Sequence, residues 1–349
     1  QMRIATEEII PGEGVTEVRM LSDYFPDLAG TAGDTQIYVL QGEQEGGSCL
    51  ILGGTHANEL GGHMGAVLFV ENAKVEAGTL YVIPRTNNSA FTHNDPQEGH
   101  PSTVHITTDE GNVREFIHGS RATNPVDQWP DPDVYVNYMG QSLSGSENRN
   151  INRTYPGKAD GTLTEMMSYG IVQLINTENI DVTVDLHEAS PEYPVINALI
   201  AHERAMNLAS NVVVDMQMEG VQISLEPSPT DLRGLTHREL GDHTDTLALL
   251  MEAPNPAQGR LRDRTDEALV LTGKSETYVK AGEIGQLYVP YDENGWPIEV
   301  RCARHVFGIE RILANYSEMY EEPIIVTGMP SYDELVKNGM GPYLNEPTT

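Results

Sequence analysis

The sequence predicts an α/β fold in which a mixed, mostly parallel central sheet is flanked by helices and followed by a C-terminal extension. Short apolar runs bounded by turn residues are typical of buried strands. These runs alternate with helical patterns, which is the order that builds a sheet covered by helices. Polar residues follow several runs directly, at the strand ends where sites gather in such sheets. With 349 residues and 39% hydrophobic content, the chain is long enough for one large domain with an appendage.

The first part of the chain reads as a hairpin followed by a strand–helix–strand unit. Residues 17–21 and 35–40 alternate apolar and polar side chains, as a half-buried hairpin does. The apolar run 49–52 predicts a buried strand, and a helix over 62–72 and a strand over 79–84 follow it. This order favours a sheet with helices on its faces.

Residues 91–145 lose the regular pattern and are rich in Pro, Gly, Asp, Asn and His. An irregular run of this length inside a compact domain is typical of an insertion or a functional lid. Its histidines match no ligand spacing, so they are interpreted as loop histidines: His93, His100, His105 and His118.

The middle of the chain continues the alternation of helices and strands. Thr162 followed by Glu165 is a capping box that predicts a helix from residue 162. The remaining predicted elements are strands over 181–186, 195–200 and 246–251 and an amphipathic helix over 202–219.

The C-terminal part carries helical patterns over 265–281 and 301–320 and a short apolar run over 324–326. We therefore expect a catalytic domain over 1–282, with residues 283–349 as an extension packed on it.

The composition excludes several partners. The net charge of −31 argues against nucleic acid and anionic membrane surfaces. No run of 18 apolar residues exists, so no membrane span is expected. Cys49 and Cys302 are expected to be free thiols, with one disulfide as the alternative. Because the chain begins with Gln1, removal of a preceding signal segment is favoured, which predicts an extracytoplasmic rather than a cytoplasmic location.

His56 and Glu59 follow the strand at 49–52 and are the first candidate metal ligands. Zinc binds imidazole nitrogen and carboxylate oxygen together and leaves a position for water in catalytic sites. Such a pair also arises by chance in a chain with 11 His and 52 acidic residues. His187 ends the strand at 181–186 and is placed to be the third ligand, with Asp185 steadying the site.

Two further features point to chemistry at the same edge of the sheet. Glu252 ends an apolar strand, where a carboxylate is costly unless it has a partner or a task, so it is a candidate general base. The loop 147–157 contains Asn152 and Arg153, and Arg offers a rigid fork for carboxylates. A solvated polar turn is the alternative interpretation of this loop.

Four stretches together resemble the zinc carboxypeptidase fold and, within it, the succinylglutamate desuccinylase/aspartoacylase family. In the family's order they are Gly-Gly-Thr-His-Ala-Asn-Glu at 53–59, Asn-Ile-Asn-Arg at 150–153, Asp-Leu-His at 185–187 and Met-Glu-Ala-Pro-Asn-Pro-Ala-Gln-Gly at 251–259. The resemblance implies that one Zn²⁺ per chain binds a defined ligand set: His56, Glu59 and His187. It also implies that Glu252 deprotonates the water that zinc activates.

By the same resemblance, Asn152 and Arg153 hold the carboxylate of a substrate, and a separate Arg stabilises the oxyanion. The family commonly has Asp where this chain has Asn150, and the expected position of the oxyanion Arg holds Gly145. Arg149, from a shifted loop, is the expected replacement. Arg238 is a candidate for a further anionic subsite, with a surface ion pair as the alternative.

The leading hypothesis is a zinc-dependent hydrolase that cleaves the amide bond of an N-acyl amino acid or a similar small carboxylate. One alternative is a metallocarboxypeptidase acting on peptides or cell-wall fragments. Another is a scaffold or assembly protein with a vestigial site. A homo-oligomer is compatible with all three, and comparing acylated amino acids with dipeptides separates the two enzymes.

Overall fold

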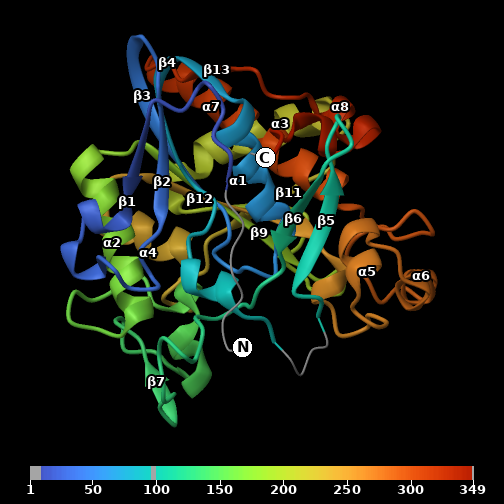
Figure 1. The fold of residues 1–349 in the computed structure, drawn as a ribbon, viewed down its shortest axis with the longest axis horizontal. Coiled ribbons are helices and arrows are strands. Elements are labelled where there is room, and N and C mark those ends of the chain that lie inside the picture. Colours follow the sequence, from blue (N-terminus) through green and yellow to red (C-terminus); the bar gives the residue numbers. More distant parts are fainter. Residues whose placement is uncertain (1–8, 96–99, 348–349) are drawn as a thin grey trace.

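A nine-stranded sheet lies at the centre of the computed structural model, which describes residues 9–95 and 100–347 (Figure 1). In spatial order its strands are β1 (Glu17–Met20), β2 (Gln36–Gln41), β4 (Lys74–Ile83), β3 (Gln44–Leu52), β9 (Val182–Ala189), β12 (Leu247–Pro254), β10 (Ala198–Ala201) and β11 (Ser224–Pro227), with β13 (Ile325–Thr327) paired to β4. The central strands β4, β3, β9 and β12 run parallel, and β1 and β2 pair antiparallel with their neighbours. Strand β10 pairs antiparallel with β12 and parallel with β11. The predicted mixed sheet with a parallel centre is confirmed.

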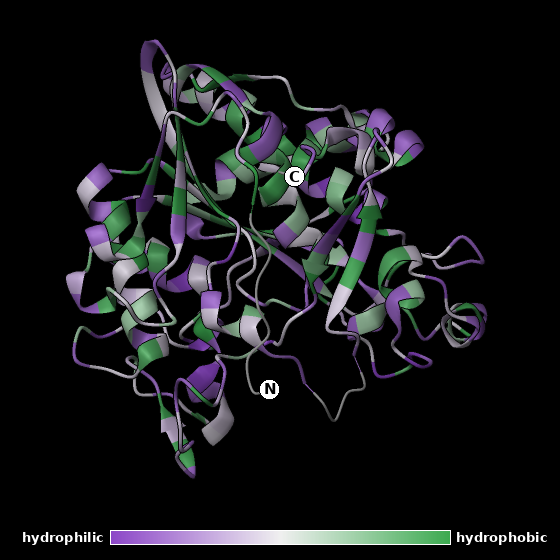
Figure 2. Cartoon of the chain, viewed as in Figure 1, coloured by the Kyte–Doolittle hydropathy of each residue, from purple (hydrophilic) through white to green (hydrophobic). Residues whose placement is uncertain are grey.

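Successive side chains of the strands enter two separate cores, one on each face of the sheet. In β3, Cys49 and Ile51 belong to one core, and Leu50 and Leu52 belong to the other. The first core packs against α1 (Leu60–Asn72), α3 (Met206–Met218) and α7 (Ile298–Tyr320). The second packs against α2 (Leu163–Glu178) and α4 (Thr236–His243). Figure 2 shows hydrophobic colour along the inner strands and on the helices beside them, as layered packing requires.

Most predicted elements form close to their expected residues. The capping box of α2 is present, since Glu165 Oε2 accepts a 2.9 Å hydrogen bond from the Thr162 amide and Thr162 accepts one from the Glu165 amide. The helix expected over 202–219 is divided, because a 3₁₀ turn at Glu203–Ala205 precedes α3. Cys49 and Cys302 are both buried and free, as expected.

Residues 91–145 contain more regular structure than expected. They form one hairpin from β5 (Thr103–Thr107) and β6 (Val113–Ile117) and another from β7 (Val134–Val136) and β8 (Ser142–Ser144). The expectation of a structureless run is wrong, because β5, β6 and β7 each bury at least one side chain, among them Val104, Phe116 and Tyr135.

The C-terminal part adds helices and a strand to the same layers. The helix expected over 265–281 is two helices, α5 (Glu267–Thr272) and α6 (Glu276–Glu283), because Gly273 ends α5 at φ +58°. Beyond residue 283, α7 packs on α1 and α3, β13 joins the sheet, and α8 (Tyr332–Asn338) contacts α7. A domain boundary at residue 282 stays a prediction. Within the described residues, no helix has the length and apolar character that crossing a membrane requires.

Candidate active site

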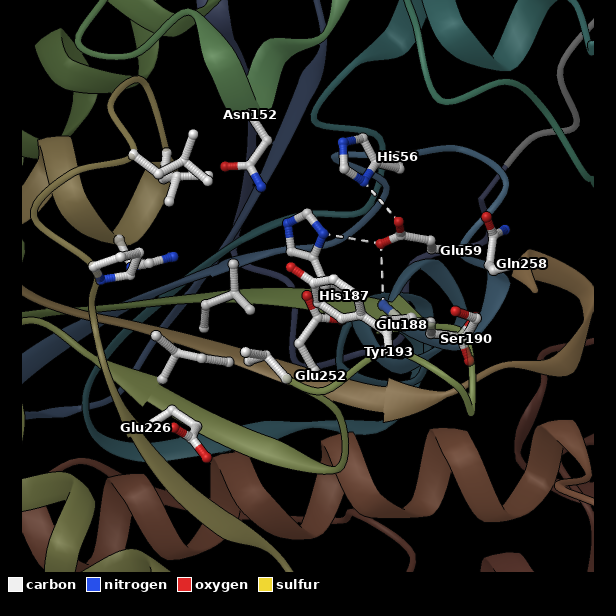
Figure 3. Close-up of a pocket in the computed structure, with 18 of the residues that line it drawn as sticks. His56, Glu59, Asn152, His187, Glu188, Ser190, Tyr193, Glu226, Glu252 and Gln258 are labelled. Atoms are coloured by element: carbon white, nitrogen blue, oxygen red, sulfur yellow. Dashed lines mark hydrogen bonds and ion pairs between the residues drawn. The ribbon is translucent and has the colours of Figure 1, made fainter. Parts of the chain in front are cut away.

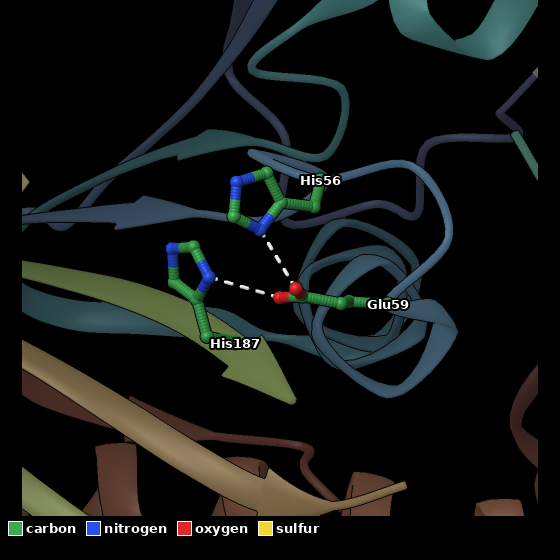
Figure 4. A group of neighbouring side chains, drawn as sticks. All are labelled: His56, Glu59 and His187. Carbon is green, nitrogen blue, oxygen red and sulfur yellow. Dashed lines mark hydrogen bonds and ion pairs between the residues drawn. The ribbon is translucent and has the colours of Figure 1, made fainter. Parts of the chain in front are cut away.

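The three predicted metal ligands lie together at the carboxyl ends of two neighbouring strands (Figure 4). Glu59 Oε1 lies 2.7 Å from His56 Nδ1, and Glu59 Oε2 lies 2.9 Å from His187 Nδ1. His56 and Glu59 belong to the turn after β3, and His187 belongs to β9. Because β3 and β9 pair in parallel, their ends meet at the same edge of the sheet.

The outward ring nitrogen of each histidine has a fixed partner. His187 Nε2 lies 2.8 Å from Asp185 Oδ2, and Asp185 Oδ1 accepts a 2.6 Å hydrogen bond from Thr55. His56 Nε2 lies 2.9 Å from Asn150 Oδ1. Such partners orient a ligating imidazole, so both histidines present Nδ1 to the same point.

Asn150 replaces the expected Asp and still supplies an oxygen to His56. Its Nδ2 donates a 2.8 Å hydrogen bond to Glu147 Oε2, which fixes the orientation of the amide. The replacement therefore retains the acceptor and removes one negative charge beside the histidine.

This ligand set fits zinc. One nitrogen of each histidine and one carboxylate oxygen lie within 4.8 Å of one another, and all three residues are buried. Burial by itself raises the pKa of Glu59 and lowers that of His187. Attraction to His56 and His187 outweighs burial for Glu59 and holds the pKa of its carboxyl group well below the usual value. Attraction to Asp185 and Glu59 holds the pKa of His187 well above its usual value. A divalent cation would replace this internal ion pair with the same donors.

Glu252 lies beside the histidine cluster without a partner of its own. It stands in β12 directly opposite His187 of β9. Its Oε2 atom is shielded from solvent and has no hydrogen-bond partner among the described residues. Burial raises the pKa of this carboxyl group. A half-buried acid with one shielded, unpartnered oxygen beside the His–Glu–His cluster is available to hold and release a proton.

Asn152 and Arg153 also line the cavity in front of the cluster. Asn152 Oδ1 accepts hydrogen bonds from the Thr236 amide at 2.8 Å and the Thr236 hydroxyl at 2.9 Å. Its amide nitrogen is therefore the free end, and Figure 3 shows that nitrogen turned toward His187. Arg153 donates a 2.7 Å hydrogen bond to the Asn152 carbonyl, and its Nε lies 3.7 Å from Glu147 Oε2.

The structure does not bring Arg149 or Arg238 to this cavity. Arg149 does not line the cavity, because its guanidinium is held by a two-pronged ion pair with Asp131, at 2.7 and 2.9 Å, and by a 2.8 Å hydrogen bond to the Thr123 carbonyl. Arg238 of α4 pairs with Glu203 at 2.6 Å and with Asp242 at 2.8 Å. Both side chains form ion pairs away from the cavity. For Arg238 this corresponds to the alternative interpretation as an ion pair.

Arg121 is a cationic side chain beside the cluster that was not predicted from the sequence. Its Nη1 lies 3.4 Å from both Glu59 Oε1 and His56 Nδ1, and 43% of the side chain is exposed to the cavity and solvent. Two backbone hydrogen bonds bring it there, since Ala57 and the Gly119–Ser120 segment exchange them at 3.0 Å. No local sequence pattern predicts that the 91–145 segment pairs with the turn containing His56 and Glu59. The sequence shows only that Arg114 and Arg121 are the arginines of that segment.

The cavity has a volume of about 710 Å³ and two chemically different parts. One part contains the cluster, Glu252, Asn152, Arg153 and Arg121. The other has walls of Val195, Ile200, Leu232, Leu235 and Leu250 and includes the carboxylate of Glu226. Figure 3 shows Glu226 on the opposite side of Glu252 from His56. A cavity of this size admits a molecule larger than a single free amino acid.

No protein-family model and no curated protein sequence matches this chain. Solved structures similar to it include a succinylglutamate desuccinylase from Silicibacter sp. TM1040, with 15% identity, a TM-score of 0.45 and coverage of 81% of this chain and 61% of that one. A metallo-carboxypeptidase from Burkholderia cenocepacia has 12% identity and a TM-score of 0.49, covering 88% and 66%. An aspartoacylase family protein from Mesorhizobium loti has 16% identity and a TM-score of 0.38, covering 72% and 64%.

This chain thus spans less than two thirds of the length of each of these proteins. The desuccinylase and the aspartoacylase family protein carry the two names of the family that the four sequence motifs resemble.

Proposed function

We propose that this protein is a zinc-dependent hydrolase that cleaves the amide bond of an N-acyl amino acid or a similar small carboxylate. The observation that carries the proposal is the convergence on one cavity of a His–Glu–His cluster, a half-buried Glu252 with an unpartnered oxygen, the Asn152 amide, and the guanidinium groups of Arg121 and Arg153. Amide hydrolysis uses all of these groups, because it needs a water, a proton carrier and a donor for the developing oxyanion.

His56, Glu59 and His187 would hold one zinc ion, through two Nδ1 atoms and a carboxylate oxygen. Bound there, zinc would supply the acidity that turns water into a nucleophile near neutral pH and would polarise the substrate carbonyl.

Glu252 carries the proton in this mechanism. Its unpaired Oε2 accepts a proton from the attacking water as the water oxygen bonds to the carbonyl carbon. The same carboxyl group then returns the proton to the amide nitrogen as the carbon–nitrogen bond breaks. The products are a carboxylic acid from the acyl group and an amine; near neutral pH the acid's remaining proton passes to the amine, giving a carboxylate and an ammonium ion, and the atoms balance without any other reactant.

Arg121 replaces Arg149 in our assignment of the oxyanion donor. Its guanidinium lies within 3.4 Å of the cluster, whereas Arg149 is held by Asp131. A guanidinium at that position stabilises negative charge on the carbonyl oxygen more in the transition state than in the substrate. Asn152 and Arg153 then hold the carboxylate of the substrate, with an amide and a rigid fork.

A metallocarboxypeptidase acting on peptides is the second candidate. The size of the cavity favours it, since about 710 Å³ exceeds what one short N-acyl amino acid requires. The same residues would perform the same chemistry on a peptide bond.

The test is turnover by zinc-loaded protein of two matched substrate series, Nα-acetyl amino acids and glycyl dipeptides. Glu252→Gln keeps the shape of the side chain and removes its ability to accept a proton, so kcat should fall about 10²–10⁴-fold with zinc content unchanged. Glu45→Gln removes an exposed carboxylate from the far end of β3 and should leave kcat unchanged. Equal turnover by Glu252→Gln and wild type, or no turnover of either series, would refute the proposal.

A further inference from the structure

We infer that Glu226 makes this site selective for substrates whose side chain ends in a positive charge, such as acylated or peptide-linked lysine and related diamino acids. This inference rests on the proposed hydrolase function and names its substrate class. It is carried by the position of Glu226 in the cavity and by the absence of any partner for its carboxylate.

Glu226 belongs to a row of side chains that crosses three neighbouring strands. Ile200 of β10 stands opposite Leu250 of β12 on one side and opposite Glu226 of β11 on the other. Residues directly opposite each other in a sheet point to the same face, so these three side chains form one continuous surface. All three line the cavity.

This surface faces the reaction centre and not the opposite core. Leu225, the residue before Glu226, packs against the core formed with α1, α3 and α7. Since successive side chains of a strand alternate, Glu226 points to the other face. Glu252 lies two residues beyond Leu250 in β12 and therefore shares that face.

The carboxylate of Glu226 is unpaired. It has no hydrogen bond or ion pair with any residue of the described chain, although it is half-buried and the chain contains Arg121, Arg153 and Arg260 around the same cavity. Apart from the proposed proton carrier Glu252, the other acids of the cavity wall are engaged. Glu59 contacts His56 and His187, Glu188 pairs with Arg301, and Glu192 accepts hydrogen bonds from Tyr278 and from the Arg260 amide. A charged group kept partly out of water without a partner is costly unless a ligand supplies the opposite charge.

The spacing suits a long aliphatic side chain with a cationic end. The α-carbons of Glu252 and Glu226 are two inter-strand spacings apart across the sheet and two residues apart along the strands, which corresponds to about 12 Å. The substrate backbone would lie at Glu252, Asn152 and Arg153, and its side chain would extend along Ile200 and Leu250. Lysine has an apolar stem and a compact ammonium group, which match these walls and their acidic end.

The apolar walls also provide discrimination. An ion pair strengthens where water is excluded, and an acidic substrate side chain would place two like charges at the end of this part of the cavity. The net charge of −31 further favours the approach of cationic over anionic ligands.

The first experiment compares Nα-acetyl-lysine with Nα-acetyl-norleucine, which has a similar stem without the charge, using zinc-loaded protein. We expect kcat/KM to favour lysine by about tenfold or more, because a hydrogen bond to a charged group contributes at this level. Glu226→Gln should remove most of this preference, bringing the lysine-to-norleucine ratio of kcat/KM close to one. Glu45→Gln, which removes one exposed charge elsewhere, should keep the preference.

The second experiment is independent of turnover and measures calorimetrically the binding of free L-lysine and L-norleucine to wild type and Glu226→Gln. Tighter binding of lysine that is lost in Glu226→Gln, without turnover of any substrate, would support the subsite and refute the proposed hydrolase. Equal binding of the two amino acids to wild type, or the same lysine preference in Glu226→Gln, would overturn the inference even if the enzyme hydrolyses both series.

Discussion

Glu188 Oε1 lies 2.7 Å from Arg301 Nε, and both side chains are completely buried. Glu188 follows the candidate metal ligand His187 in β9, whereas Arg301 comes from α7, in the predicted C-terminal extension. The second oxygen of Glu188 accepts hydrogen bonds from the Gly61 amide at 3.0 Å and from Asn255 at 2.8 Å. The Glu188 carboxylate therefore connects β9, the start of α1 and the residue after β12 to helix α7.

Replacing Arg301 should strongly destabilise the protein. Arg301→Met leaves Glu188 buried without its cation, and breaking a buried pair in this way costs about 3–5 kcal/mol. Urea unfolding, followed by circular dichroism, measures this loss. The matched control is the double variant Arg301→Met/Glu188→Gln, which should recover part of it. A loss below about 1 kcal/mol in the single variant would show that the pair does not hold these segments together.

Zinc content tests the cluster directly. We expect about one zinc per chain in protein supplied with zinc, because the donor set of His56, Glu59 and His187 is typical of this metal. His187→Ala should lose the metal. His105→Ala, on the exposed hairpin, is the control and should keep it. Elemental mass spectrometry on dialysed samples gives the answer, and equal metal in wild type and His187→Ala would contradict the assigned ligands.

Arg121 and Arg149 are distinguished by paired substitutions. Arg121→Met should lower kcat about 10²–10³-fold with a smaller effect on KM, because an oxyanion donor acts mainly in the transition state. Arg149→Met breaks the pair with Asp131 and should lower the unfolding midpoint while folded protein keeps its kcat. The opposite result, with Arg149→Met losing turnover and Arg121→Met retaining it, would restore the assignment predicted from the sequence.

Acid should destabilise the protein partly through His305 of α7. Burial, with a further contribution from the neighbouring Arg304, lowers the pKa of His305 from 6.5 to about 3. The unfolded chain therefore binds a proton between these values that the folded protein does not. Stability from this group is complete above pH 6.5 and is lost as the pH falls below it, at about 1.4 kcal/mol per unit.

The measurement is the unfolding free energy of wild type and His305→Leu between pH 7.5 and 5. Other titrating groups contribute equally to both proteins, so the difference isolates His305. The variant should show the shallower dependence on pH. Parallel curves for the two proteins would mean that His305 gains its proton in the folded state as easily as in the unfolded one.

The sequence by itself determined the elements and the core of the site. Strands such as β3 and the capped helix α2 follow from local hydrophobic period and capping, which do not depend on distant residues. His56 and Glu59 are neighbours in the chain, and His187 and Glu252 end parallel strands. Their meeting at one edge therefore follows from the fold class.

Only the tertiary structure decided that Arg121 and Glu226 line the cavity and that Arg149 and Arg238 do not. Arg121 is brought to Glu59 by backbone pairing of a segment with no periodic signal, whereas Arg149 and Arg238 are engaged by Asp131 and Glu203. Glu226 reaches the cavity through the register of β10 with β11. The ion-pair partners of long side chains can lie far apart in the sequence, and the register of a strand depends on the whole sheet. Local sequence patterns therefore predict neither the ion pairs nor the register.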